Sequence, residues 1–426
     1  MKQFKYVLII SLCVSILALI SGCNALPTSS TKGIQESEAL FVPHPISELT
    51  EELQTTIAGS NQLGYLLVQN FVEDENVLIS PASLSFALAM LQNGAKDETL
   101  EGILKVMGEP SQDGLNQRYN TLISTLMNDA DSDDEHDLTV LLGNSFWLRD
   151  SLNPKQDFID KLTENYDAEI FKSDFFDPKS VDQINQWIED KTNDLLKDTI
   201  KEISDETIAY LMNTVYFKGA WLKPYKAEGT FIDTFYMLDG SSKQVPMMHQ
   251  NNHFDYFESD KAQIAAFPYF GGMTMKVVLP KADIQTLLDE TPYETLQSWL
   301  SKAETITPKL NVSMPKFEYD VKNSLSDALK AAGMSQSFDP YSADFSAMVE
   351  IEDQNVFVSE IFQNCKIIND EKGTEAAAVT VVEMEATSAP VVEDEPISFN
   401  CNKPFLYVIE EDATGAILFM GVVLKP

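Results

Sequence analysis

Few residues in this sequence have the type and spacing needed for catalysis or metal binding. The chain has 4 His and 4 Cys, and it lacks the Ser-centred, phosphate-binding, dinucleotide-binding and zinc-protease motifs. His249 and His253 have the i,i+4 spacing that can place two metal ligands on one helix face. Their neighbours show no helical stripe and no acidic third ligand, so we expect exposed or hydrogen-bonded histidines here. The sequence predicts no metal, no cofactor and no enzyme.

Two further groups of residues have simple explanations. The acidic run at residues 129–137 lacks the central glycine of a calcium-binding loop, so we expect a solvated loop. Cys13 lies in the apolar N-terminal segment, whereas Cys365 and Cys401 lie in apolar runs typical of strands. We therefore expect two buried free thiols in the body of the protein.

One stretch near the C-terminus has a pattern without an obvious explanation. Every second residue from Thr374 to Met384 is small or apolar, and the alternate set, beginning at Glu375, includes three carboxylates. Period two is typical of a strand with one buried face. The residues that follow, Ala386 to Glu395, have the composition of a loop. The pattern alone leaves two interpretations open, an ordinary edge strand followed by a turn or a strand-competent segment held in a loop.

These residues must be positioned by a large acidic body. The chain has 426 residues, 44% of them hydrophobic, and a formal net charge of −36. The composition is globular, and domains of about 150 residues would give two or three of them. A chain of this length can bury a core without disulfides. The negative charge excludes nucleic-acid binding, because a phosphate backbone requires clustered Lys and Arg.

The periodicity predicts an α+β fold that forms one large cooperative unit. Helical stripes dominate the first half of the chain, and an N-cap signal at Ser80-Pro81 begins one of them. Apolar runs suited to buried strands dominate the second half. The expected helices cover 82–93, 96–107, 115–126, 158–166 and 184–195, and the expected strands cover 138–148, 208–217, 273–280, 355–368, 404–409 and the end of 414–424.

The N-terminus has the features of a targeting segment. Lys2 and Lys5 precede an apolar run, at residues 6–20, that is shorter than a typical membrane span. The run ends in Ser21, Gly22 and Cys23, an order that resembles the lipidation signal of bacterial lipoproteins. We expect a signal peptide at 1–22 and a flexible tether at 23–47 with lipid on Cys23, which would anchor an outward-facing domain to the cell envelope. The alternative is an ordinary signal peptide with an incidental cysteine.

Several separated motifs in the body of the chain resemble those of the serpins, a family of protease inhibitors. The motifs lie at 76–83, 185–192, 213–221, 314–317, 343–346, 399–405 and 419–421. The resemblance implies one serpin domain at 48–426, with about eight or nine helices around a large mixed sheet, two smaller sheets and an exposed reactive-centre loop. It also implies a monomer that acts as a suicide substrate.

The resemblance assigns roles to residues of the patterned stretch. Its hinge matches Glu371, Gly373, Thr374, Glu375, Ala376, Ala377 and Ala378. Counting from this hinge places the scissile bond at Thr387–Ser388. Thr387 is small and uncharged, so the implied target is an elastase-like or subtilisin-like serine protease. The alternative is a non-inhibitory serpin-fold binding protein at the cell surface.

The resemblance also implies a polar cluster below the point where the main sheet opens. Its members here are Ser80, Ser83, Asn144 and Gln363. The family usually has a histidine at the position of Gln363, and glutamine retains donors and an acceptor. We therefore expect the network to persist without a histidine-dependent response to pH.

Overall fold

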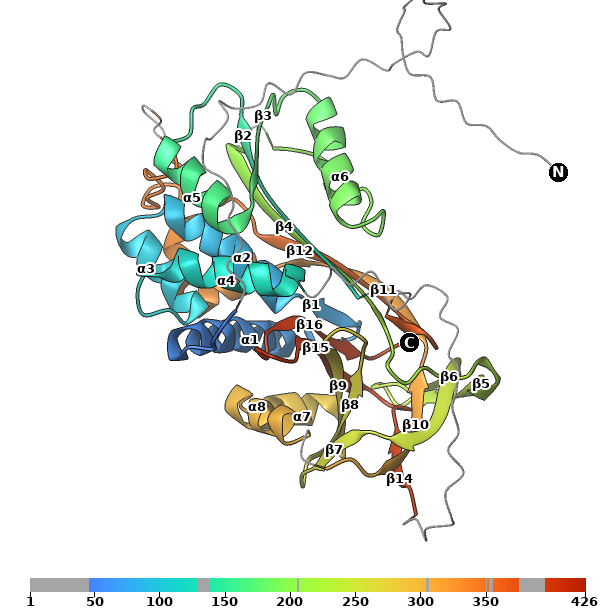
Figure 1. Cartoon of the computed structure of the whole chain (residues 1–426). Helices are drawn as coiled ribbons and strands as arrows, with labels where there is room; N and C mark the ends of the chain where they lie inside the picture. The colour runs from blue at the N-terminus through green and yellow to red at the C-terminus, as the bar shows by residue number, and fades with distance from the viewer. Residues whose placement is uncertain are drawn as a thin grey trace, which may run out of the picture.

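The fold of the protein is given by a computed structural model, and it is α+β as the sequence predicts. The structure describes residues 46–128, 138–204, 207–303, 306–349, 351, 355–374 and 395–426. In this part of the chain, nine α-helices and three sheets surround two hydrophobic clusters, a large one that extends from Leu53 to Leu424 and a smaller one beneath α6. Helices α1 to α5 lie on one side of the main sheet and α6 lies on the other (Figure 1). The large cluster includes residues from all three sheets, and the cooperativity of the unit stays a prediction.

The main sheet has the strand order β11-β12-β13-β4-β2-β3. It is mixed, because β2 pairs with β3 in parallel and with β4 antiparallel. Its strands are β2 (Thr139–Arg149), β3 (Glu169–Ser173), β4 (Ala209–Ala220), β11 (Phe317–Ser324), β12 (Phe362–Asn369) and the short β13 (Gly373–Thr374).

The second sheet forms the centre of the core and has the order β1-β16-β15-β9-β8-β7. Every residue of β9, β15 and β16 is buried, which explains why their sequences are mostly apolar. The buried Lys276 of β9 forms an ion pair with Glu410 of β15. Its strands are β1 (Val77–Ile79), β7 (Asp255–Glu258), β8 (Ala262–Pro268), β9 (Met273–Pro280), β15 (Phe405–Glu411) and β16 (Ile417–Val423).

The third sheet has the order β14-β10-β6-β5, so β14 and β5 are its two edges. Its strands are β5 (Thr230–Tyr236), β6 (Ser242–His253), β10 (Lys309–Pro315) and β14 (Ile397–Asn400). The sequence analysis did not predict these strands, because exposed and buried residues mix along them.

The helices begin and end where local signals place them. Ser80 Oγ accepts a hydrogen bond from Ser83 N at the start of α2, and Gly108 ends α3 in the left-handed conformation. The helices are α1 (Glu51–Phe71), α2 (Pro81–Leu91), α3 (Asp97–Met107), α4 (Leu115–Asn128), α5 (Gln156–Tyr166), α6 (Lys179–Lys191), α7 (Ile284–Glu290), α8 (Tyr293–Lys302) and α9 (Ser326–Leu329). Among these described helices, none is long and apolar enough to cross a membrane.

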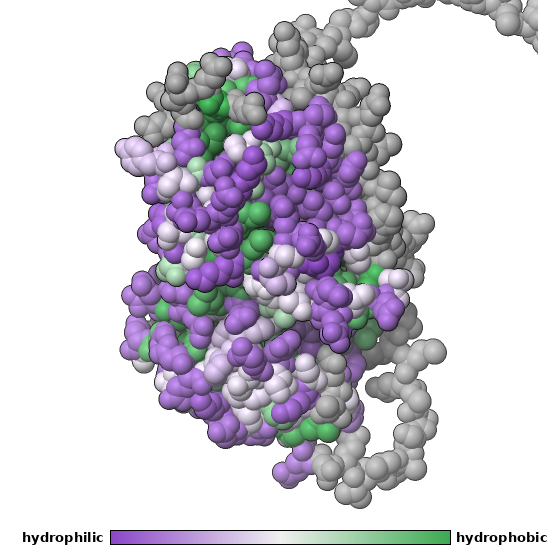
Figure 2. All heavy atoms as spheres, turned by 90° about the vertical axis from the view of Figure 1, so that its left-hand side faces the viewer, coloured by the Kyte–Doolittle hydropathy of each residue, from purple (hydrophilic) through white to green (hydrophobic). Residues whose placement is uncertain are grey.

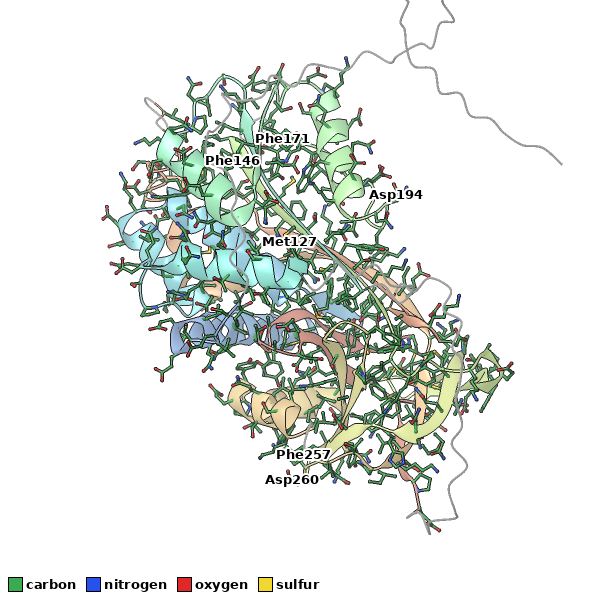
Figure 3. The ribbon with its side chains drawn as sticks, viewed as in Figure 1. Met127, Phe146, Phe171, Asp194, Phe257 and Asp260 are labelled. Atoms are coloured by element: carbon green, nitrogen blue, oxygen red, sulfur yellow. The ribbon has the colours of Figure 1, made fainter. Side chains whose placement is uncertain are left out.

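Aromatic side chains pack on both faces of the main sheet. Phe146 of β2 packs on Phe158 of α5, with ring centroids 5.2 Å apart. On the opposite face, Phe171 of β3 stacks on Trp147 at 4.1 Å, in the cluster that α6 covers. Figure 3 labels Phe146, Phe171 and Asp194, the last just beyond the end of α6. The side of the molecule that carries α3 and α5 is largely hydrophilic (Figure 2).

Two sequence predictions were wrong in their boundaries. The strand expected at 355–368 begins only at Phe362, because backbone groups of Val358 and Ile361 bond to residues 325–337 instead of a ladder. The helix expected at 184–195 ends at Lys191, after which Asn193 and Asp194 have positive φ. Cys23, the signal peptide and most of the tether at 23–47 lie outside the described residues, so lipidation and location stay predictions.

Candidate functional site

After β12 the chain makes a tight turn. The two-residue strand β13 that follows this turn fits between β12 and β4. Thr374 of β13 pairs with Asn369 of β12, and Gly373 and Thr374 pair with Ala220 and Gly219 of β4. The patterned stretch therefore begins inside the main sheet. Its first described residues already act as the start of a strand.

A tight turn delivers β13 to this position. Asp370 Oδ1 accepts from Lys372 N at 2.9 Å, and Asp370 N donates to the carbonyl oxygen of Gly373 at 2.9 Å. The segment after β4 fixes the turn from outside, since Trp221 Nε1 donates to the carbonyl oxygen of Asp370 at 3.0 Å. Trp221 N and Tyr225 N donate to the next two carbonyls of the turn at 2.8 Å. The turn is thus held by a second, distant part of the chain.

Only glycine fits at position 373. A Cβ added there would lie 2.0 Å from the carbonyl oxygen of Gly219 and 2.9 Å from Cα of Ala220. Both are backbone atoms of β4, and they cannot move aside without breaking the ladder. The glycine therefore permits the close approach of β13 to β4.

Thr374 is anchored in a buried aromatic cluster. Its side chain is 3% exposed, and its hydroxyl lies 2.6 Å from the Tyr269 hydroxyl. The Tyr269 ring stacks on Trp221, with centroids 4.3 Å apart and an interplanar angle of 11°. Burial raises the pKa of Tyr269 well above its ordinary value, so its hydroxyl stays neutral. Position 374 accepts a small polar side chain and has no exit to solvent.

An ion pair closes the base of the hinge. Lys316, between β10 and β11, places Nζ 2.6 Å from Glu371 Oε2, and the Glu371 side chain is 18% exposed. Burial alone would raise the pKa of Glu371, but hydrogen bonds and the charge of Lys316 hold it below its ordinary value of 4.5. The carboxylate is therefore ionised at neutral pH and ties the turn to the end of β10.

This ion pair predicts a pH-dependent contribution to stability. Because the pKa of Glu371 is lower in the folded state, its stabilisation is present above about pH 4.5 and is lost as pH falls through the folded value. Glu371→Gln is expected to lower the melting temperature by about 1–2 °C at pH 7, and the difference should vanish near pH 3. Glu318→Gln, which removes the more exposed Glu318–Lys366 pair, is the control. An equal Glu371→Gln deficit at both pH values would contradict the assignment.

β12 and β4 flank β13 in the main sheet. β12 pairs with β11, and β4 pairs with β2, but among the described residues no ladder joins β12 directly to β4. These two strands also carry buried side-chain oxygens without a hydrogen-bond partner in the described part of the chain: Asn213 Oδ1, Thr214 Oγ1, Asn364 Oδ1 and Asn369 Oδ1. Among the described residues, the site is thus a two-residue strand between β12 and β4, which share no ladder of their own.

Comparisons with known proteins agree with this geometry. The family model for serpins (serine protease inhibitors) matches residues 58–426. The chain belongs to the serpin family. A serpin-like protein from Methanosarcina acetivorans is 32% identical, over 100% of this chain and 99% of its own length. Antithrombin-III from Mus musculus is 31% identical, over 83% and 77% of the two chains.

Solved structures are also similar to this serpin. The thermophilic serpin Tengpin in its native state superimposes with a TM-score of 0.79 and 29% identity, covering 91% of this chain and 97% of that one. The expected serpin fold, with a large mixed sheet and two others, is confirmed. Two of the three sheets have six strands each in the described residues.

Gln363 occupies the position below the opening and links β12 to α2. Its Oε1 accepts from Ser80 N at 2.8 Å, and its Nε2 donates to the carbonyl oxygen of Ser80 at 2.9 Å. Ser80 in turn caps α2 through Ser83 N. The side-chain amide of Gln363 thus forms two hydrogen bonds with the backbone of one residue, Ser80. Neither partner in this contact titrates near neutral pH.

The expected polar network is divided into two parts in the structure. Asn144 belongs to a different part from Ser80 and Gln363. Asn144 lies on β2 opposite Asn213 of β4. Its Oδ1 accepts from Asn213 Nδ2, and its Nδ2 donates to the carbonyl oxygen of Tyr166, both at 2.6 Å. Asn213 was not predicted as a member of this network, although it begins the motif at 213–221. An Asn in the middle of an apolar strand was the available signal.

The remaining sequence-predicted residues are placed as follows. Glu375, Ala376, Ala377, Ala378, Thr387 and Ser388 lie outside the described residues. His249 and His253 are on β6, where His249 stacks on Phe231. Cys365 and Cys401 are buried free thiols, as expected. In the described ranges, no group of three His, Cys, Asp or Glu side chains could hold a metal ion.

Proposed function

We propose that this serpin inhibits a serine protease as a suicide substrate, with Thr387–Ser388 as its reactive bond. The observation that carries the proposal is β13, a strand already begun between β12 and β4, whose facing edges lack a common ladder in the described residues. The segment that continues from β13 alternates small and acidic residues, which suits a strand with one buried face. The main sheet thus has a position for a longer strand between β12 and β4, and the segment after β13 has the sequence pattern of such a strand.

The chemistry of trapping uses the catalytic residues of the protease. Its serine Oγ attacks the carbonyl carbon of Thr387, and an ester bond forms as the peptide bond breaks. The amine of Ser388 leaves with the proton that the protease histidine delivers. The new N-terminal half of the loop is then free to extend β13, while its end remains esterified to the protease.

Strand extension supplies the force that stalls deacylation. About 14 residues at roughly 3.3 Å each span about 45 Å, so the tethered protease moves along the domain. A dozen new ladder hydrogen bonds at about 1 kcal/mol each contribute on the order of 10 kcal/mol. Distortion of the protease active site that costs less than this is sustained, and water then fails to release the ester.

The reactive residue points to the target class. Thr387 and the preceding Ala386 are small and uncharged, which favours a shallow elastase-like pocket or a permissive subtilisin-like one. Incubation with elastase-, subtilisin- and trypsin-like proteases is expected to give an SDS-stable complex with one of the first two classes. Absence of any complex would refute inhibition.

The same reaction tests the position of the reactive bond. Mass spectrometry of the peptide released on denaturing the complex is expected to show a fragment that begins at Ser388. A fragment beginning elsewhere would overturn the assignment of Thr387 while leaving inhibition intact. Replacing Thr387 by arginine provides a positive control, because it should redirect the inhibitor toward trypsin-like proteases.

A further inference from the structure

The second sheet contains a buried ion pair where its two halves meet. β15 and β16 form a hairpin, and β15 joins this hairpin to β9, the last strand of the β7–β8–β9 meander (Figure 1). Lys276 of β9 and Glu410 of β15 form the pair, and their side chains are 3% and 9% exposed. Charged side chains are rarely buried to this extent, so the pair calls for an explanation.

The two charged residues are diagonal neighbours across the ladder. Lys276 lies directly opposite Val408, and Glu410 lies two residues farther along β15, opposite Thr274. Residues two apart on one strand point to the same face, so the two long side chains can meet there. A slip of one residue between β9 and β15 would place Lys276 and Glu410 on opposite faces of the sheet and separate them.

The apolar pattern gives little information about this register. Every residue of β9, β15 and β16 is buried, so neither face of these strands is marked by solvent-facing side chains. In a half-buried strand, a one-residue slip would expose the apolar set and is strongly disfavoured. Here a slipped strand would still bury apolar side chains on both faces. The neutral contact between the hydroxyls of Tyr407 and Tyr319, 2.7 Å apart, adds a weaker constraint.

The ion pair distinguishes the two faces that the apolar pattern leaves equivalent. β8, β9, β15 and β16 together contain three charged residues, Lys276, Glu410 and Glu411. Glu411 already accepts hydrogen bonds in the next turn, from Ala413 N at 2.7 Å and Thr414 N at 2.8 Å. A slip that moved Glu411 into the place of Glu410 would take its carboxylate from this turn and leave Glu410 buried on the other face. Separating a buried ion pair in this way is strongly destabilising.

We propose that the Lys276–Glu410 pair fixes the register in which the β15–β16 hairpin joins β9. The pair then acts mainly against misaligned forms of the second sheet, and it adds little to the stability of the correct one. The same register also holds the third sheet in place, because only residues 401–404 separate β14 from β15. This role concerns how the fold is completed and is independent of the proposed function.

The test replaces both charges by apolar side chains of similar length, in the double variant Lys276→Met/Glu410→Met. Because neither charge remains buried, we expect its melting temperature to stay close to that of the wild type. With the register no longer fixed, we expect the yield of native protein on refolding from denaturant to fall by about threefold or more. Hydrogen exchange followed by mass spectrometry should show two populations in peptides from β9 and β15.

Lys366→Met/Glu318→Met is the matched control. Lys366 of β12 and Glu318 of β11 are also diagonal neighbours, with Nζ 3.0 Å from Oε1, but their side chains are 26% and 58% exposed. More and less buried residues alternate along β11 and β12, so the apolar pattern fixes the register there. We expect this variant to refold with the wild-type yield and a single population.

The exchanged variant Lys276→Glu/Glu410→Lys separates the pair from its individual side chains. It restores an ion pair at the same two positions, and we expect it to regain most of the refolding yield that the apolar variant loses. A wild-type yield and a single population in the apolar variant would overturn the inference. Failure of the apolar variant to fold would mean that the pair is needed for stability, and an equal loss in the exchanged variant would assign the effect to packing. Either result would also overturn it.

Discussion

Replacing Thr374 by arginine is expected to turn this serpin from an inhibitor into a substrate. Thr374 is buried between β12 and β4, with its hydroxyl against Tyr269. An arginine there would bury an unpaired charge at a cost of several kcal/mol, so it would leave the sheet and delay strand extension. Deacylation would then be faster than strand extension. We expect cleaved inhibitor with at least a tenfold smaller yield of SDS-stable complex.

Two milder variants serve as controls. Thr374→Ser keeps the hydroxyl, and Tyr269→Phe removes its partner without adding charge; both should retain complex formation. Proline at position 374 should act like arginine, because it lacks the N–H that a ladder needs. Full covalent complex with Thr374→Arg would mean that extension of β13 is not the trapping step.

Cleavage of the reactive loop without trapping is expected to raise the melting temperature by at least about 10 °C. Once cut, the loop can complete the strand that β13 begins, and on the order of 10 kcal/mol of new hydrogen bonding then stabilises the fold. The measurement is differential scanning calorimetry before and after limited proteolysis within residues 382–390, with the cut mapped by mass spectrometry.

The same calorimetric experiment separates the two kinds of serpin. A non-inhibitory binding protein would keep its melting temperature after the cut, and that result would contradict the proposed function. Gly373→Val is the internal control, because its side chain would collide with the backbone of Gly219. We expect a smaller rise in melting temperature for this variant.

Local signals in the sequence were sufficient for the elements that position the site. The Ser80-Pro81 cap placed α2, and the apolar runs placed β2, β4 and β9. Period two from Thr374 left a strand or a strand-competent loop open, and of the patterned residues only Thr374, in β13, is described. Such signals are reliable because they act over a few residues.

The long-range contacts of the site had no comparable signal. Lys316 and Glu371 are 55 residues apart, and Tyr269 and Thr374 are 105 apart. Asn144 and Asn213 meet only because β2 and β4 pair in one register. Pairings of this kind are set by the whole fold and not by spacing along the chain.

The short strand β13 has a kinetic consequence. Starting a new strand is slow, because the first residues lose their freedom before many hydrogen bonds form. In the structure that nucleus is already present, since Thr374 is paired with both β12 and β4 and Gly373 is paired with β4. Under the proposed mechanism, the competition between strand extension and hydrolysis would begin at propagation, where each added residue forms hydrogen bonds at once. The rate of trapping should accordingly depend on how fast successive residues add to the strand, and only weakly on how fast the strand is nucleated.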